Sequence, residues 1–268
     1  MGAHTPLVER DRLLLAERDD WANARIATSG DAVLLVRSSA QGDVLMARGD
    51  AGGVSDLLDA EARLRHCTNA GGALWLGAPR AVTVPASVLD ALELTGVAGW
   101  DWMATATVPA DVSSSELASQ SGPQRASAVT VLLDVDRDAP AIYEVLRQAN
   151  PRSTADPAGE HEVAWWGAFA GEDLVGVIGA RSQQGDPRSR DLSWHLHGLG
   201  VLPSARGGGY GRALTAAATR HGLETGADWV SLGLYADNDG ARRIYQRLGF
   251  TLEAEMASYG PVPDTYSI

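Results

Sequence analysis

The chain has 268 residues, which suggests one large domain or two modest domains at roughly 100–200 residues each. Its 22 cationic and 34 acidic side chains give a formal net charge of −12, and so acidic a surface repels phosphate backbones, so nucleic acid is not an expected partner. With 45% hydrophobic and 21% charged residues the composition is that of an ordinary globular protein. No apolar run approaches the ~20 residues that span a bilayer, and the start lacks the apolar core of a signal peptide. We expect a cytoplasmic protein with no membrane partner.

Two residue types are scarce. The sequence contains no lysine, so all 22 cations are arginine. Lysine Schiff-base chemistry, pyridoxal phosphate attachment and a Walker-type phosphate loop are therefore excluded. Cys67 is the only cysteine, which excludes internal disulfides and cysteine-rich zinc sites. We expect its thiol to fill the core rather than to act as a nucleophile.

The first part of the chain, residues 1–110, is predicted to be a mixed α/β domain. Apolar spacing places Leu57, Leu58 and Leu64 on the inward face of one of its helices. No chemically distinctive group of side chains is visible in this part. The expected elements are helices at 8–21 and 56–64 and strands at 32–37, 43–47, 73–76 and 100–103, the first two strands pairing across the turn at Gln41-Gly42.

A serine-rich stretch with Gly and Pro, residues 111–125, is predicted to be a linker, and residues 126–268 form the second domain. Strands followed by a strand–helix–strand–helix–strand run describe an α/β (α+β) domain with a mixed sheet and helices on its faces. The expected strands are at 129–133, 163–169, 174–180, 192–201, 229–235 and 250–256. The expected helices run from about 139 to 150, from the glycine-rich turn to 221, and from 240 to 248.

The clearest motif lies between a predicted strand and a predicted helix, in residues 199–214. Pro203 ends the strand, and glycines at positions 207, 208, 209 and 211 follow. Glycines let backbone N–H groups converge on an anion, and a helix N-terminus adds about half a positive charge at the same place. Arg206 and Arg212 supply cations. The segment predicts a pyrophosphate site; the alternative is a flexible glycine-rich loop.

The pattern Arg206-x-x-Gly209-x-Gly211, preceded by Val201-x-Pro203, resembles the acetyl-CoA signature of the GNAT superfamily of N-acetyltransferases. Residues 238–250 resemble the superfamily's Asn-x-x-Ala-x-x-x-Tyr block followed by Gly-Phe, so the resemblance covers about 126–260. It implies a mixed central sheet with flanking helices and a splayed parallel strand pair that admits the thioester arm of acetyl-CoA. The residues implied to bind acetyl-CoA are Leu199, Gly200, Val201, Arg206, Gly207, Gly208, Gly209, Tyr210, Gly211, Arg212, Asn238, Ala241 and Tyr245.

Two histidines, His195 and His197, lie two residues apart on the strand 192–201, so both rings face one side of the sheet. An amine with a pKa of about 10.4 must lose a proton before it attacks, and histidine, with a pKa near 6.5, is suited to take it, directly or through water. The strand also resembles that of arylalkylamine N-acetyltransferases, in which both histidines serve proton removal. That group tends to have alanines where Gly198 and Gly200 stand here. The alternatives are a structural histidine pair and a metal pair, for which no third ligand can be assigned.

Tyr245 has two interpretations. Ala241, Ile244, Tyr245 and Leu248 form a core-facing helical stripe, which predicts a buried aromatic ring. The resemblance implies instead that the hydroxyl points at the sulfur of CoA. A thiolate with a pKa of about 8.5 and a phenol with a pKa of about 10 make proton donation only slightly uphill.

These observations predict an acetyl-CoA-dependent N-acetyltransferase that acts on a primary amine of a small molecule by direct attack, without a metal. Backbone N–H near Val201 would hold the oxyanion. The first domain is expected to be a degenerate second copy of the fold, as in tandem members of the superfamily such as mycothiol synthases. Because it lacks the glycine turn, we expect it to bind no CoA and instead to shape the acceptor site or an interface. The alternatives are a non-catalytic acyl-CoA sensor, a mycothiol-synthase-like enzyme, a protein N-acetyltransferase and a His-x-His metalloenzyme. The acceptor and the oligomeric state are left open by the sequence.

Overall fold

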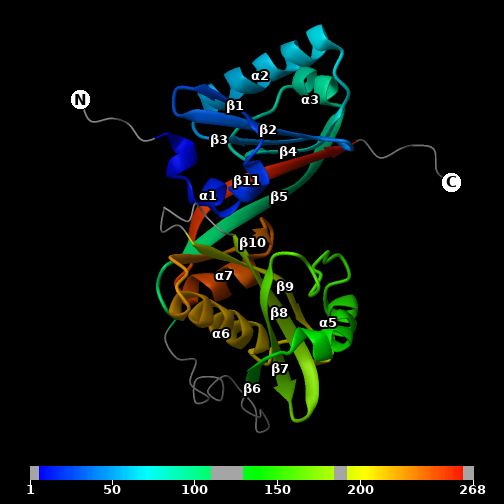
Figure 1. Ribbon diagram of the computed structural model, residues 1–268, viewed down its shortest axis with the longest axis vertical. Helices are drawn as coiled ribbons and strands as arrows, with labels where there is room; N and C mark the ends of the chain where they lie inside the picture. The colour runs from blue at the N-terminus through cyan, green and yellow to red at the C-terminus, as the bar shows by residue number, and fades with distance from the viewer. Residues whose placement is uncertain (1–5, 110–128, 184–191, 262–268) are drawn as a thin grey trace, which may run out of the picture. The chain divides into compact units, whose positions relative to one another are not determined.

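The structure is a computed structural model, and it describes residues 6–109, 129–183 and 192–261 (Figure 1). The predicted linker at 111–125 lies outside the described residues. The described chain forms two compact units, each built from separate segments. The first holds the residues up to Trp102, Leu234–Asn238 and those from Leu252 onward; the second holds Met103–Gly233 and Asp239–Thr251. The domain boundaries 1–110 and 126–268 stay a prediction.

The first unit is a layer of helices on a sheet. Its elements are η1 (Leu7–Glu9), α1 (Arg12–Ala16), η2 (Asp19–Trp21), β1 (Arg25–Ser29), β2 (Ala32–Ser39), β3 (Gly42–Arg48), α2 (Ala51–Thr68), β4 (Ala73–Pro79), α3 (Ala86–Leu92), β5 (Leu94–Thr105) and β11 (Thr251–Pro261). The strand order is β1-β2-β3-β4-β11-β5. The predicted hairpin across Gln41-Gly42 is confirmed, with Ser39 opposite Gly42.

The start of the chain differs from the sequence prediction. The single helix expected over 8–21 is three short pieces, η1, α1 and η2. Asp11 is the N-cap of α1, and its carboxylate accepts hydrogen bonds from the backbone N–H groups of Leu13 and Leu14 at 3.1 and 3.2 Å. A capping aspartate fixes a helix start at that position, so the chain cannot continue one helix through residues 8–21.

Helix α2 is longer than predicted, and two side chains on it were wrongly assigned to the core. Leu64 is 45% exposed and Cys67 is exposed. The inward face continues from Leu57 and Leu58 at helical spacing through Glu61 and Arg65, both of which are only 4% exposed. Because charged residues occupy the rest of the inward face, apolar spacing places Leu57 and Leu58 correctly but misplaces Leu64.

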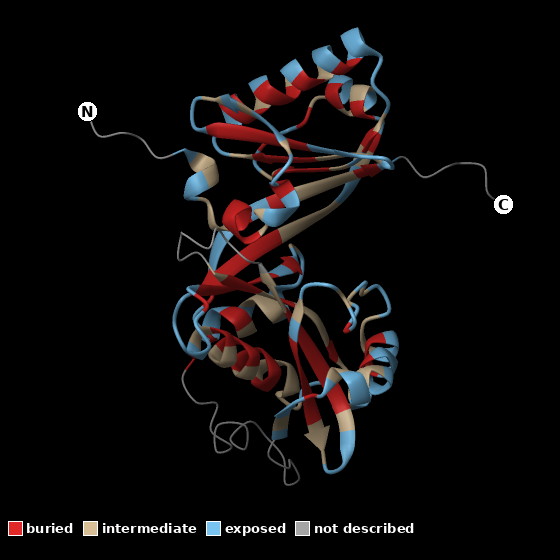
Figure 2. Ribbon diagram, viewed as in Figure 1, coloured by how far each residue is buried: buried red, intermediate tan, exposed pale blue. Residues whose placement is uncertain are grey.

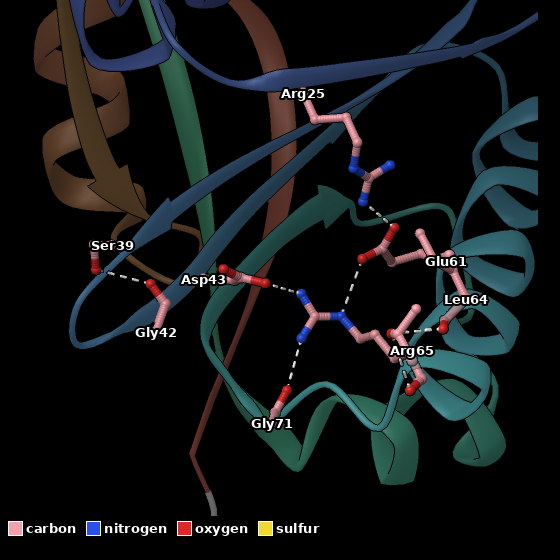
Figure 3. Close-up of polar contacts among 9 residues, drawn as sticks. Arg25, Ser39, Gly42, Asp43, Glu61, Leu64, Arg65 and Gly71 are labelled. Carbon is pink, nitrogen blue, oxygen red and sulfur yellow. Dashed lines mark hydrogen bonds and ion pairs between the residues drawn. The ribbon is translucent and has the colours of Figure 1, made fainter.

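The buried charges on α2 form one ion-pair network within the first unit (Figure 3). The guanidinium of Arg65 donates to Glu61 Oε1 at 3.0 Å, to the carbonyl of Gly71 at 2.8 Å and to Asp43. Arg25 donates to the second oxygen of Glu61. Each buried charge therefore faces an opposite charge, which offsets the cost of removing it from water.

The second unit also consists of a sheet with helices. Its elements are β6 (Val129–Leu132), α5 (Val135–Ala149), β7 (Glu162–Ala170), β8 (Asp173–Gln183), β9 (Ser193–Val201), η3 (Pro203–Ala205), α6 (Tyr210–Glu224), β10 (Trp229–Tyr235) and α7 (Asp239–Arg247). The strand order is β10-β9-β8-β7-β6, antiparallel except for the parallel pair β9/β10. The predicted mixed sheet with flanking helices is confirmed.

Helices α5 and α6 cover opposite faces of this sheet (Figures 1 and 2). Neighbouring residues of β7 show the division: Trp165 packs in a cluster with Ile142 and Leu146 of α5, whereas the ring of Trp166 lies 5.6 Å from that of His221 in α6. Both tryptophans are buried, at 0% and 4% exposure. The histidine-bearing face of β9 is the α5 face, since the His197 ring contacts Trp165.

Two element starts in the second unit differ from the sequence prediction. Helix α5 begins at Val135 rather than near Ala139, so Pro140 lies inside the helix instead of in its first turn. Strand β7 begins at Glu162, one residue earlier than predicted, which places this residue in the sheet. Among the described residues, none of the helices combines the length and the apolarity that a membrane span requires.

Candidate functional site

The parallel strands β9 and β10 part in the middle of β9. They pair over only four residues of each strand, from Ser193/Trp229 to Leu196/Leu232, while β9 continues to Val201. Gly198 has φ +61, and β9 carries one more residue than β8 between the pairs Gly179/His197 and Val177/Gly200. This is a bulge with glycine in the left-handed region, a device that bends a strand and ends its pairing. The bulge directly follows His197.

The glycine turn follows the free end of β9. Gly207 and Gly209 have φ +74 and +84, values that L side chains rarely adopt, and Gly209 is the N-cap of the 15-residue helix α6. As a glycine, this N-cap offers no side-chain hydrogen bond to the first turn of the helix. A Cβ on Gly211 would lie 3.8 Å from Val201 and 4.0 Å from Leu199, so nothing within the protein requires glycine there. A helix N-terminus that begins with glycine at the N-cap is suited to bind an anion.

The corresponding turn of the first unit is closed. Strands β3 and β4 are parallel and joined by α2, as β9 and β10 are joined by α6. The N-cap of α2 is Asp50, whose carboxylate accepts from the backbone N–H of Gly53 at 2.9 Å. A Cβ on Gly53 would lie 2.5 Å from the carbonyl of Ser29, so backbone of the β1–β2 turn lies against the helix start. This turn therefore already holds a carboxylate of the protein itself.

The two arginines of the glycine turn differ in their contacts. The guanidinium of Arg206 donates to the carbonyls of Val201 and Ala149 at 3.3 and 3.1 Å, which fastens the turn to the C-terminus of α5. Arg212 is half-buried in the first turn of α6. The roles of both as anion ligands stay predictions.

His195 is held by the neighbouring strand. Its Nδ1 lies 3.0 Å from the hydroxyl of Ser231, which in turn donates to the carbonyl of Trp194 at 3.4 Å. Burial, with smaller contributions from the charges of Arg181 and His197, lowers the pKa of His195 to about 3. His195 is therefore neutral at physiological pH, with Nδ1–H bonded to Ser231 and Nε2 left as an acceptor.

His197 has a different partner. Its Nε2 lies 3.1 and 2.9 Å from the two carboxylate oxygens of Glu162. The ring of Trp165 meets the ring of His197 edge-on, at 5.5 Å between centroids. The two histidines thus share one face of β9, but only His197 contacts a carboxylate.

Tyr245 lies in α7, which is beside α6 (Figure 1). It is 7% exposed, and burial raises the pKa of its hydroxyl to about 12. Its ring packs on Phe250 at 6.0 Å between centroids. The phenol is therefore protonated, with a donor to offer. Ala241 is half-buried in the same helix. Asn238 precedes this helix and belongs to a segment of the first unit. Its backbone N–H donates to the carbonyl of Tyr235 at 3.0 Å.

Three polar residues near the histidines, Glu162, Arg181 and Ser231, were not anticipated from the sequence. Together with His195 they lie opposite one another on β7, β8, β9 and β10, forming one row across the sheet. Only the strand register reveals this row; the one sequence signal was a pair of histidines on the same face. Within the described segments, no three His, Cys, Asp or Glu side chains gather as a metal ion would require.

Comparison with known proteins relates this chain to acetyltransferases. A model of the Acetyltransferase (GNAT) family matches residues 132–250, so this segment is similar to that family. Over nearly the whole chain, the fold is that of the GCN5-related N-acetyltransferases from Kribbella flavida and Sphaerobacter thermophilus. They cover 96% and 95% of this chain and 97% and 91% of their own, at TM-scores of 0.54 and identities of 19% and 16%.

Curated relatives match part of the chain. Mycothiol acetyltransferases from Streptomyces scabiei, Nocardiopsis dassonvillei and Pseudarthrobacter chlorophenolicus are 36%, 42% and 35% identical over 102, 66 and 116 residues. These segments are 38%, 25% and 41% of this chain. The chain spans only 30%, 20% and 36% of the lengths of these relatives.

Proposed function

We propose that this protein is an N-acetyltransferase that transfers the acetyl group of acetyl-CoA directly to a primary amine of a small molecule. One observation carries the proposal: the glycine turn at the start of α6 adjoins the end of β9 that β10 leaves unpaired, with His197 at the point of parting. A binding turn for a phosphorylated carrier and a base candidate thus lie on one strand.

The residues of the turn fit the diphosphate of acetyl-CoA. The open direction of the missing Cβ at Gly211 leaves the first turn of α6 accessible to an anion, and the positive φ angles of Gly207 and Gly209 favour glycine in the turn. When bound, acetyl-CoA supplies the activated acetyl group. Because Asp50 and the β1–β2 turn close the equivalent turn of the first unit, we propose one acetyl-CoA site per chain.

We assign proton removal to His197 rather than His195. Moving a proton from an amine with a pKa of about 10.4 to a ring with a pKa of about 3 is unfavourable by about 7 pKa units, or about 10 kcal/mol. His195 instead acts as a neutral hydrogen-bonding group. His197 instead touches a carboxylate, which stabilises an imidazolium.

Tyr245 is proposed to assist the departure of CoA as a hydrogen-bond donor. A phenol with a pKa of about 12 is a weaker acid than a thiol with a pKa of about 8.5 by about 3.5 units, so the thiolate does not take its proton outright. A hydrogen bond from the buried hydroxyl stabilises the developing thiolate without that transfer.

Two observations bear on the identity of the acceptor amine. The relatives named mycothiol acetyltransferase make the mycothiol system the first acceptor class to test. The net charge of −12 favours encounter with a cationic amine.

The test is a panel of amines scored for CoA release: aminosugar thiols including mycothiol precursors, aminoglycosides, polyamines, arylalkylamines and peptide N-termini. We expect amine-dependent thiol release with at least one of them, and a calorimetric stoichiometry of one acetyl-CoA per chain. Binding without release by any amine would indicate an acyl-CoA sensor instead. No binding of acetyl-CoA would refute the proposal entirely.

A further inference from the structure

The carboxylate of Glu162, at the first position of β7, is held by two donors. The indole Nε1 of Trp165 donates to Oε2 at 2.7 Å, and Nε2 of His197 lies 3.1 Å from Oε2 and 2.9 Å from Oε1. Only 12% of the Glu162 side chain and 19% of the His197 side chain are exposed. The pair is thus largely removed from water, where charge-assisted hydrogen bonds are strongest.

Trp165, which orients this carboxylate, has no room to move. It is fully buried, and a Cβ on Gly179 would lie 2.6 Å from its ring. A Cβ on Gly198 would lie 2.9 Å from the same ring. Both glycines therefore pack directly against the indole ring, and this close packing fixes the Glu162 carboxylate beside His197.

This arrangement determines which nitrogen of His197 carries the proton. An ionised carboxylate only accepts hydrogen bonds, so Nε2 of His197 must be the donor, and the lone pair of the neutral ring lies on Nδ1. His195 has no such partner, because its Nδ1 bonds to the hydroxyl of Ser231. The other charged group in the row is Arg181, opposite Glu162 on β8.

We propose that Glu162 is a positioning residue that fixes the Nε2–H tautomer of His197, so that Nδ1 receives the proton of the acceptor amine. The inference rests on the proposed function. The N–H bond of the ammonium breaks and an Nδ1–H bond forms, directly or through one water. The resulting imidazolium is stabilised by the carboxylate it already contacts, and the proton then passes to solvent.

The test is Glu162→Gln. In the variant, the amide oxygen still accepts from Trp165, but the amide NH₂ faces Nε2 of His197 and turns that nitrogen into an acceptor. We expect the neutral ring to change to the Nδ1–H tautomer, seen in the ¹⁵N shifts of His197 at alkaline pH. With the proton-accepting lone pair lost, kcat falls on the order of 10²-fold, while KM for acetyl-CoA is unchanged.

Two further variants separate positioning from folding. Glu162→Asp keeps a carboxylate and should retain the wild-type tautomer with an intermediate kcat. Asp173→Asn removes an exposed carboxylate from the other end of the β7–β8 hairpin and should leave both readouts unchanged. An unchanged tautomer in Glu162→Gln, or equal losses of kcat in the Gln and Asp variants, would overturn the proposal.

The experiment also distinguishes this inference from the function it rests on. If wild-type protein releases CoA with an amine and Glu162→Gln does so equally well, only the role of Glu162 fails. If wild-type protein releases no CoA with any amine, the proposed function fails and the catalytic role of Glu162 fails with it. The tautomer measurement then still decides whether the carboxylate orients the ring.

Discussion

Gly211→Ala separates the demands of the fold from the demands of acetyl-CoA. Gly211 is the second residue of α6, and an added Cβ would make only ordinary contacts, at 3.8 Å to Val201 and 4.0 Å to Leu199. Alanine is favoured over glycine in a helix, so the free energy of unfolding should rise by about 0.4–1 kcal/mol. For a chain of this size that is an increase in Tm of about 1–4 °C.

Binding should change in the opposite direction. The Cβ would stand over the backbone donors proposed to hold the diphosphate. Loss of one hydrogen bond to a charged group costs about 1.5–3 kcal/mol, which is about a 10- to 150-fold increase in the Kd of acetyl-CoA. Thermal unfolding of the free protein and isothermal calorimetry with acetyl-CoA measure the two effects separately.

A matched control lies in the first unit. Gly52 is the second residue of α2, and its added Cβ would lie 3.5 Å from Asp50, again an ordinary contact. Gly52→Ala should give a similar rise in Tm with no change in acetyl-CoA affinity. If Gly211→Ala binds acetyl-CoA as tightly as Gly52→Ala does, the diphosphate does not lie at the start of α6 and our placement is refuted.

Three further outcomes are expected. Arg65→Met removes the cation that contacts Asp43 and one carboxylate oxygen of Glu61. In urea titrations the free energy of unfolding should fall by about 3–5 kcal/mol. Mutation of the exposed Arg147 should not shift the unfolding midpoint. Tyr245→Phe should lower kcat for CoA release at least tenfold with acetyl-CoA affinity kept; an unchanged kcat would remove the hydroxyl from the reaction. His195 has a folded-state pKa of about 3 against about 6.5 when unfolded, so its stabilising contribution is complete above pH 6.5 and is lost as pH falls toward 3. Wild-type protein should therefore lose about 3–5 kcal/mol more over that range than His195→Gln, and parallel stability curves would contradict the assignment.

Much of the second unit could be predicted from local sequence. Pro203 and the four following glycines stand between an apolar strand and an amphipathic helix, and only a strand–turn–helix accommodates that order. The alternation around His195 and His197 likewise placed both rings on one face, because side chains of a strand alternate strictly.

The tertiary structure decided what sequence spacing could not. The inward face of α2 contains Glu61 and Arg65, so apolar spacing assigned Leu64 to the core although it is exposed. Burial of those charges is possible only because Asp43 and Arg25 approach from strands far away in the sequence. A rule based on hydrophobicity cannot anticipate that compensation.

The chain by itself determined that a bare glycine turn precedes a helix and that two histidines share a strand face, since both follow from backbone geometry over a few residues. The pairing of β7, β8 and β9 decided what each histidine can do. It set a carboxylate against His197, and it placed the half-buried His195 beside Ser231 and Arg181. Proton affinity depends on solvent and charge within a few ångströms, and long-range strand register alone brings those groups together.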